Sequence, residues 1–178
     1  MTRELSRYIH TDSLTELPNR RCFDENLDKD WLKSAEVGKA MAIIMLDLDN
    51  FRSYNAMFGY QGADNCLRWV AESLSAVGNM RNAVVSRYGG ASFVLTLSED
   101  RTPEGRARVD MLADQLRQTV ISLQIPHPQP GIGEYLTASV GVAVEADVRE
   151  GTPSDLVARA EKALAIAKAE GKNRVSVL

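Results

Sequence analysis

The sequence has few of the residues that build metal or redox sites. Its 178 residues include two cysteines, Cys22 and Cys66, and two histidines, His10 and His127. The cysteines lie far apart without a C-x-x-C spacing, which favours structural burial over a disulfide scaffold or a zinc site. The histidines are also distant from each other, and His127 stands among prolines in an expected loop. Neither a histidine metal site nor a catalytic triad is indicated.

Long apolar runs and a strong charge of one sign are absent as well. The net charge is −3, which argues against a surface for nucleic acid or anionic membranes. No run approaches membrane-spanning length, and residues 1–10 lack the apolar core of a secretory signal. The composition, 44% hydrophobic and 25% charged, is typical of a soluble globular domain with a real core. We expect a single cytoplasmic domain without nucleic-acid partners or membrane contact.

Apolar residues at helical or alternating spacing divide the chain into short elements. The helical pattern places helices within residues 2–10, 23–32, 51–58, 67–77, 102–120 and 152–171. The strand pattern predicts strands at residues 41–46, 84–88, 93–97, 135–144 and 174–178. Residues 59–62, which begin and end with glycine, are expected to separate the helix at residues 51–58 from the one at residues 67–77. Thr102 and Thr152 are each followed by proline and are typical helix starts.

Two carboxylates follow the strand predicted at residues 41–46. This run is apolar throughout, which indicates a strand buried on both faces of a sheet, and it leads into Asp47 and Asp49. Carboxylates in such a place are costly to bury and seldom serve packing, so a functional site is favoured. Asp49 comes just before a predicted helix and is interpreted as its cap.

A Gly-Gly pair joins the two strands predicted at residues 84–88 and 93–97. Gly89 and Gly90 between alternating apolar runs predict a tight β-hairpin. Because neither residue has a Cβ atom, a ligand's phosphates or a metal ion could approach the backbone closely there. On spacing alone, a hairpin without chemistry is the favoured interpretation, since most Gly-Gly turns do no chemistry.

The hairpin sequence at residues 87–93, RYGGASF, resembles the signature of the GGDEF domain, the diguanylate cyclase family. In that signature Arg-Tyr-Gly-Gly is followed by two acidic residues and Phe. Other segments resemble further motifs of the family in the family's order. Residues 12–20 resemble D-x-L-T-G-L-P-N-R, residues 47–64 resemble D-x-D-x-F-K-x-x-N-D-x-x-G-H-x-x-G-D, residues 137–143 resemble T-x-S-x-G-x-A, and residues 167–173 resemble A-K-x-x-G-R-N.

The resemblance implies an α/β (α+β) fold, with a mixed, largely antiparallel five-stranded sheet flanked by helices, similar to polymerase palms and adenylyl cyclase cores. It implies that residues 1–11 are the end of a linker helix and residues 12–178 a degenerate GGDEF domain. A diguanylate cyclase joins two GTP molecules, one held by each domain of a dimer, so a homodimer is also implied.

The nucleotide-binding positions of the family are largely retained. Asn55 and Asp64 take the positions that read guanine, whose Watson–Crick edge offers donors at N1 and N2 and an acceptor at O6. Lys168 and Lys172 take those that hold the triphosphate, and Arg52 keeps the positive charge of the family's lysine. Without the resemblance, the first pair are ordinary turn residues and the lysines merely complement a helix dipole.

The metal-binding and catalytic positions are not retained. The resemblance assigns Mg²⁺ to the Asp47 carboxylate and the Leu48 carbonyl, together with the signature acids. Ala91 offers no ligand at the first acidic position, and the neutral hydroxyl of Ser92 is a poor one at the second. Mg²⁺ is therefore expected to bind weakly and only together with nucleotide. No catalytic residue remains among the signature positions Gly89, Gly90, Ala91, Ser92 and Phe93.

Other family features are eroded too. Met80 and Ala83 stand at the positions of the R-x-x-D motif through which the product inhibits the family's enzymes. Near the guanine positions, Ala56, Tyr60 and Ala63 replace the family's Asp, His and Gly.

The sequence thus predicts a catalytically inactive GGDEF domain that binds GTP or a related guanine nucleotide and regulates a flanking sensory or phosphodiesterase domain in cyclic di-GMP signalling. An interaction or dimerisation module without nucleotide binding is the alternative. A residual diguanylate cyclase is a third hypothesis, which the missing acids oppose.

Overall fold

The structure is a computed structural model that describes residues 9–127, 129 and 132–178. Its five strands form one sheet in the order β2-β3-β1-β4-β5. Neighbouring strands are antiparallel except β4 and β5, which are parallel, so the expected mixed sheet is confirmed. The strands are β1 (Ala40–Leu48), β2 (Ser86–Gly89), β3 (Ser92–Glu99), β4 (Ala138–Glu145) and β5 (Val175–Val177), and the helices are α2 (Arg20–Val37), α3 (Phe51–Asn79), α4 (Pro103–Ser122) and α5 (Pro153–Ala169).

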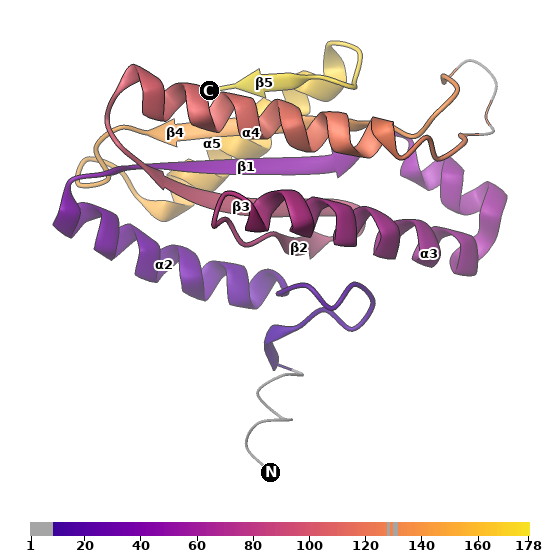
Figure 1. Cartoon of the computed structure of the whole chain (residues 1–178), viewed down its shortest axis with the longest axis horizontal. Coiled ribbons are helices and arrows are strands. Elements are labelled where there is room, and N and C mark those ends of the chain that lie inside the picture. Colours follow the sequence, from indigo (N-terminus) through magenta and orange to yellow (C-terminus); the bar gives the residue numbers. More distant parts are fainter. Residues whose placement is uncertain (1–8, 128, 130–131) are drawn as a thin grey trace.

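Strand β1 lies in the middle of the sheet and is buried on both faces, as its apolar run predicts. Its side chains at positions 42, 44, 46 and 48 belong to one core with Leu74 of α3 and Leu112 of α4. Those at 41, 43 and 45 belong to a second core with Trp31 of α2 and Leu156 of α5. Figure 1 shows α3 and α4 in front of the sheet and α5 behind it. The strand period of two therefore assigns each β1 side chain to one core.

Three helices begin at side-chain caps, and the sequence predicts two of these, Thr102 and Thr152. The Thr102 hydroxyl accepts the Gly105 N–H at the start of α4, and Thr152 accepts from Asp155 at the start of α5. Asn19 accepts from Cys22 at the start of α2. A side chain that accepts an N–H of the first turn satisfies a donor that has no partner within the helix, which explains these starts.

The predicted break at residues 59–62 is shorter than expected. Helix α3 continues from Phe51 to Asn79, and only Gly59 has a non-helical backbone, with φ 71° and ψ 180°. Gly59 reaches this positive φ without a Cβ clash. Gly62 stays helical, so one glycine kinks the helix and the other continues it.

Other boundaries differ in detail from the expected ones. The strand predicted at residues 135–144 begins only at Ala138, because Leu136 donates its N–H to Ile125 and Tyr135 forms an isolated bridge with Pro126. The helix predicted at residues 2–10 lies mostly outside the described residues. Within the described part of the chain, no helix is long and apolar enough to cross a membrane.

Candidate functional site

The end of β1 lies directly beside the Gly-Gly hairpin. The register of β1 and β3 pairs Asp47 with Ser92, and the Leu48 N–H donates to the Ala91 carbonyl over 3.2 Å. The turn needs glycine, since Gly90 has a φ of 51°. The hairpin predicted from spacing therefore forms, and it brings the degenerate signature against the predicted metal position.

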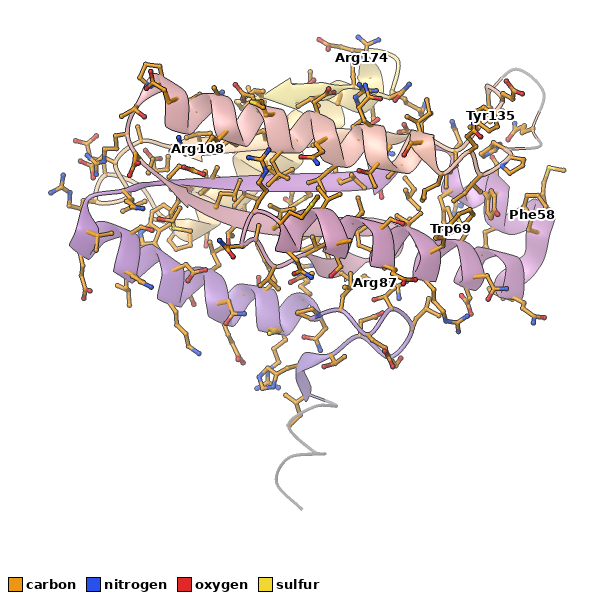
Figure 2. The ribbon with its side chains drawn as sticks, viewed as in Figure 1. Phe58, Trp69, Arg87, Arg108, Tyr135 and Arg174 are labelled. Atoms are coloured by element: carbon orange, nitrogen blue, oxygen red, sulfur yellow. The ribbon has the colours of Figure 1, made fainter. Side chains whose placement is uncertain are left out.

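Arg87 holds this hairpin in place. Its guanidinium donates to the Gly90 carbonyl over 3.1 and 2.8 Å and to both carboxylate oxygens of Asp12 over 3.1 and 3.0 Å. Figure 2 places Arg87 beside the loop that precedes α2. Burial raises the pKa of Asp12, but hydrogen bonds from Thr15 and Arg87 outweigh it and leave that pKa below its usual value.

Tyr88 connects the hairpin to α2 and α5. Its hydroxyl donates to a Glu161 carboxylate oxygen of α5 over 2.9 Å, and the Arg20 guanidinium lies 4.3 Å from its ring centre. Burial, and then the bond to Glu161, raises the pKa of Tyr88 to about 12. Arg87 and Tyr88 of the signature therefore serve to position the turn.

Both carboxylate oxygens of Asp47 are engaged by neighbouring side chains. The Ser92 hydroxyl donates to Oδ1 over 2.7 Å, and the Lys168 ammonium pairs with Oδ2 over 2.6 Å. The same ammonium lies 3.4 Å from the Leu48 carbonyl oxygen. The predicted metal ligands, the substituted signature residue and one predicted phosphate lysine thus form a single cluster.

Asp49 is not the helix cap that the sequence suggested. Its side chain is 1% exposed and accepts hydrogen bonds from the Ser139 hydroxyl at 2.6 Å, the Thr137 hydroxyl at 2.7 Å and the Asn173 N–H at 3.0 Å. Lys168 Nζ lies 3.3 Å from its Oδ1. A buried carboxylate needs such donors, and here they come from β4 and from the segment after α5.

Thr137 and Ser139 were missed as partners of this carboxylate. A signal was present, because two polar residues at i and i+2 stand at the start of an otherwise apolar run and share one face of the strand. Their target could not be identified from the sequence, since it lies about ninety positions earlier in the chain.

Asn50 takes the cap position of α3 instead. Its backbone is left-handed, with φ 54°, and its side chain makes no capping hydrogen bond. His127 lies buried against this turn, with Nε2 3.1 Å from the Asn50 carbonyl oxygen. The histidine that the sequence left in a loop therefore packs against the connection between β1 and α3.

The predicted guanine-reading residues lie on the two sides of the α3 kink. Asn55 precedes Gly59 and Asp64 follows it, and both side chains are partly exposed. Among the described residues, neither side chain has a hydrogen-bonding partner, so their polar atoms remain free for a ligand. Arg52, in the first turn of the helix, is exposed. Within the part of the chain that the structure describes, no hydrogen bond or ion pair joins these three residues to the cluster around Asp47.

Lys172 lies apart from Lys168, although both were predicted to hold phosphate. It follows the end of α5 with a left-handed backbone, φ 63°, and lines an open groove of about 610 Å³. Asn50, Tyr135 and Thr137 also line this groove. In the described part of the chain the Lys172 side chain has no ion pair, in contrast to that of Lys168.

The cluster does not fit Mg²⁺, which needs about six hard oxygen ligands at near 2.1 Å. Asp47 already accepts from two donors, the Leu48 carbonyl faces an ammonium, and Ala91 has no ligand atom. Within residues 9–127, 129 and 132–178, no group of three or more His, Cys, Asp or Glu side chains could hold a metal ion.

The positions of the product-inhibition motif also lack its groups. Met80 is 68% exposed and carries no charge, and Ala83 is buried within the connection from α3 to β2. The backbone here is tightly held, because the Ala83 N–H donates to the Gly78 carbonyl over 2.9 Å.

A family model described as "Diguanylate cyclase, GGDEF domain" matches residues 9–174. Signaling protein YkoW of Bacillus subtilis (strain 168) is 30% identical over 173 residues, which cover 97% of this chain and 21% of that protein. Diguanylate cyclase VdcA of Vibrio cholerae is 33% identical over 173 residues, which cover 94% of this chain and 46% of VdcA. The chain therefore spans less than half the length of these relatives.

Solved structures with the same fold match this chain over nearly its whole length. The coiled coil and GGDEF domain of DgcB from Caulobacter crescentus, in complex with c-di-GMP, is 29% identical with a TM-score of 0.85, and the match covers 98% of this chain and 88% of that one. Diguanylate cyclase SiaD from Pseudomonas aeruginosa, in complex with its activator SiaC, is 28% identical with a TM-score of 0.81, and covers 98% and 64%.

Proposed function

Because the chain belongs to the GGDEF family, we propose that it is a regulatory domain of cyclic di-GMP signalling that binds GTP or a related guanine nucleotide without turning it over. One observation supports the proposal that the nucleotide is not turned over. Ser92, at the second acidic position of the signature, donates a hydrogen bond to Asp47 instead of adding a carboxylate beside it. The place of the second acid is therefore taken by a neutral hydroxyl that hydrogen-bonds to the remaining carboxylate.

The lack of turnover follows from the chemistry of phosphoryl transfer. Attack of a 3′-hydroxyl on an α-phosphorus depends on groups that neutralise the developing charge and align the attacking and leaving oxygens. Removing one well-placed electrostatic group typically lowers a rate by about 10²–10³. Ala91 and Ser92 remove two such groups, so we expect a rate at background.

Guanine recognition rests on the two polar side chains flanking the α3 kink. The Asp64 carboxylate accepts from guanine N1–H and N2–H, and the Asn55 carboxamide completes the edge at O6. Lys172 and Arg52, which are exposed or groove-lining cations, attract the phosphates. Adenine has no proton at N1, so binding ATP would leave the Asp64 carboxylate unpaired at a cost of about 1–3 kcal/mol.

The domain regulates a flanking or partner domain in this proposal. It acts in the cytoplasm, as a monomer or homodimer, on a sensory or phosphodiesterase domain of the same protein. One relative supports this arrangement, since MucR of Pseudomonas aeruginosa is named a bifunctional diguanylate cyclase/cyclic di-GMP phosphodiesterase. Any Mg²⁺ enters only together with the nucleotide, is held weakly and is not required for nucleotide binding.

A second function, an interaction module without nucleotide, is favoured by the surface at the α3 kink. Met57, Phe58 and Tyr60 are 57%, 47% and 83% exposed, and Figure 2 shows Phe58 at the end of the molecule beside the kink. Exposed apolar side chains that lie together often mark a protein contact.

A calorimetric titration of GTP and ATP into the wild type and Asp64→Ala distinguishes the two functions. We expect the wild type to prefer GTP over ATP by about tenfold, consistent with the cost of one unpaired group, and Asp64→Ala to lose that preference. The matched control is Asp114→Ala on α4, whose carboxylate pairs with Arg117 at the surface. Equal affinity for both nucleotides, or no binding of either, would leave only the interaction module.

A further inference from the structure

The Lys168 ammonium lies against three oxygen atoms at the end of β1. Its Nζ is 2.6 Å from Asp47 Oδ2, 3.3 Å from Asp49 Oδ1 and 3.4 Å from the Leu48 carbonyl oxygen. An ammonium group has three N–H donors and no acceptor. Each donor therefore has one oxygen of this cluster as its partner, and the side chain is only 27% exposed.

The remaining carboxylate oxygens of the cluster are also satisfied. Asp47 Oδ1 accepts from Ser92, and Asp49 Oδ2 accepts from Thr137 and from the Asn173 N–H. Every carboxylate oxygen thus has a donor from this chain. A divalent ion could bind here only by displacing an ammonium that α5 already holds in place.

We infer that the Lys168 ammonium is the built-in cation of this site, standing where the family resemblance places Mg²⁺, and that guanine nucleotide binds here without a divalent ion. This inference rests on the proposed nucleotide binding. It also assigns Lys168 a different role from the predicted one, since an ammonium whose three donors are used has none left for a phosphate.

With Lys168 in place, the site carries less negative charge than it would with both signature acids. Asp47 and Asp49 contribute two negative charges and Lys168 one positive charge, while Ala91 and Ser92 contribute none. Acids at positions 91 and 92 would add two negative charges, which a divalent ion could offset but a single lysine could not. Mg²⁺ gives up its bound water reluctantly and needs a fuller oxygen shell than the cluster offers. A tethered ammonium, in contrast, loses little freedom on binding.

Removal of the ammonium should create the metal site that the wild type lacks. We would measure Mn²⁺ binding, with Mn²⁺ alone and no nucleotide, by electron paramagnetic resonance for the wild type, Lys168→Met and Lys168→Met/Asp47→Asn. Since affinity for such ions follows the charge of the ligands, we expect Lys168→Met to bind Mn²⁺ on the order of tenfold more tightly than the wild type. The double variant should lose this gain.

Lys162→Met is the matched control, because it removes an exposed lysine from the same helix. It should bind Mn²⁺ as the wild type does. If Lys168→Met bound Mn²⁺ no more tightly than the wild type, the inference would be overturned.

A second measurement needs no variant and so does not depend on how Lys168→Met folds. GTP affinity of the wild type should change less than about threefold between EDTA and millimolar Mg²⁺, because Lys168 already offsets one of the two carboxylate charges and occupies the place of the ion. A loss of about tenfold or more in EDTA would overturn the inference. If GTP bound under neither condition, the proposed function would fail, while the Mn²⁺ comparison would still decide the role of Lys168.

Discussion

The Arg87 guanidinium donates to both carboxylate oxygens of Asp12, over 3.1 and 3.0 Å, across 75 positions of the chain. Asp12 also accepts the N–H and the hydroxyl of Thr15, at 2.8 and 2.7 Å. This one carboxylate therefore closes the turn before α2 and fixes the hairpin beside Asp47. The position of the signature depends on a residue that lies outside it.

Replacing Asp12 with Asn should destabilise the protein in a pH-dependent way. Because the pKa of Asp12 is lowered on folding, its contribution is present above the unfolded value of about 4 and is lost as the pH falls through the folded value. We expect Asp12→Asn to lower the free energy of unfolding by about 1–2 kcal/mol at pH 7 and by clearly less at pH 3. Urea unfolding at both pH values measures this.

Asp110→Asn serves as the control, since Asp110 forms an exposed i,i+4 pair with Arg106. Such pairs contribute about 0.3–0.5 kcal/mol. An Asp12→Asn effect of equal size at pH 7 and pH 3 would show that its charge is not what stabilises the hairpin.

Much of the fold could be predicted because it depends on local patterns. The apolar run of β1, the Gly-Gly hairpin and the threonine caps at Thr102 and Thr152 each lie within a few neighbouring residues, and the structure confirms them. The sequence predicts two helices where the structure has the single kinked helix α3. Gly59 and Gly62 look alike in sequence, and only their backbone angles show that Gly59 forms the kink while Gly62 continues the helix.

The polar contacts of the site were harder to predict, because they join distant segments. Asp49 was interpreted as a cap from its neighbours, yet its partners Thr137, Ser139 and Asn173 come from β4 and from the segment after α5. Lys168 and Lys172 share an i,i+4 spacing, but α5 ends between them. One lysine therefore lies over the carboxylates and the other lines a groove.

The wild type should make no cyclic di-GMP from GTP and Mg²⁺, because neither Ala91 nor Ser92 supplies a metal ligand. Chromatography of overnight reactions against a no-enzyme control measures this. Product formed at a rate that falls in Asp47→Ala would contradict the prediction and support the residual cyclase.

Restoring the acids as Ala91→Asp/Ser92→Glu should change the response to metal. A glutamate at position 92 faces Asp47 in the strand register, and like charges placed opposite each other are destabilising. We expect this variant to unfold more easily than the wild type in EDTA, by about 1 kcal/mol, and to recover stability with Mg²⁺. Thermal unfolding with and without Mg²⁺ measures both effects. A variant whose stability ignores Mg²⁺ would show that the acids do not rebuild a cation site.

Cyclic di-GMP should not bind at the positions of the family's inhibitory motif. An arginine binds phosphate and guanine through paired donors, which Met80 lacks, and the buried methyl group of Ala83 offers no acceptor. Equilibrium dialysis should therefore show no micromolar binding to the wild type. Binding that survives the combined changes Asn55→Ala and Asp64→Ala would reveal a surface site elsewhere.

The two lysines should respond differently to Mg²⁺ in GTP binding. Lys172 lines the open groove and meets the phosphates directly in our proposal, so Lys172→Ala should weaken GTP binding by about tenfold with or without Mg²⁺. Lys168 instead pairs with Asp47 and Asp49 and offsets part of their charge. Lys168→Met should therefore weaken binding in EDTA, because two uncompensated carboxylates repel the phosphates, and Mg²⁺ should restore most of the affinity.

Calorimetric titration of GTP into both variants, in EDTA and in Mg²⁺, measures this difference, with Lys162→Ala as the control for loss of one charge from α5. The Mg²⁺ dependence of the two losses separates a lysine that contacts phosphate from one that offsets carboxylate charge. A metal ion can replace the charge of Lys168 beside the carboxylates, but it cannot replace a contact that Lys172 makes to the phosphates from another position. Equal losses for Lys168→Met and Lys172→Ala under both conditions would mean that both ammonium groups contact phosphate, as the family resemblance alone predicts, and that Lys168 leaves the carboxylates when nucleotide binds.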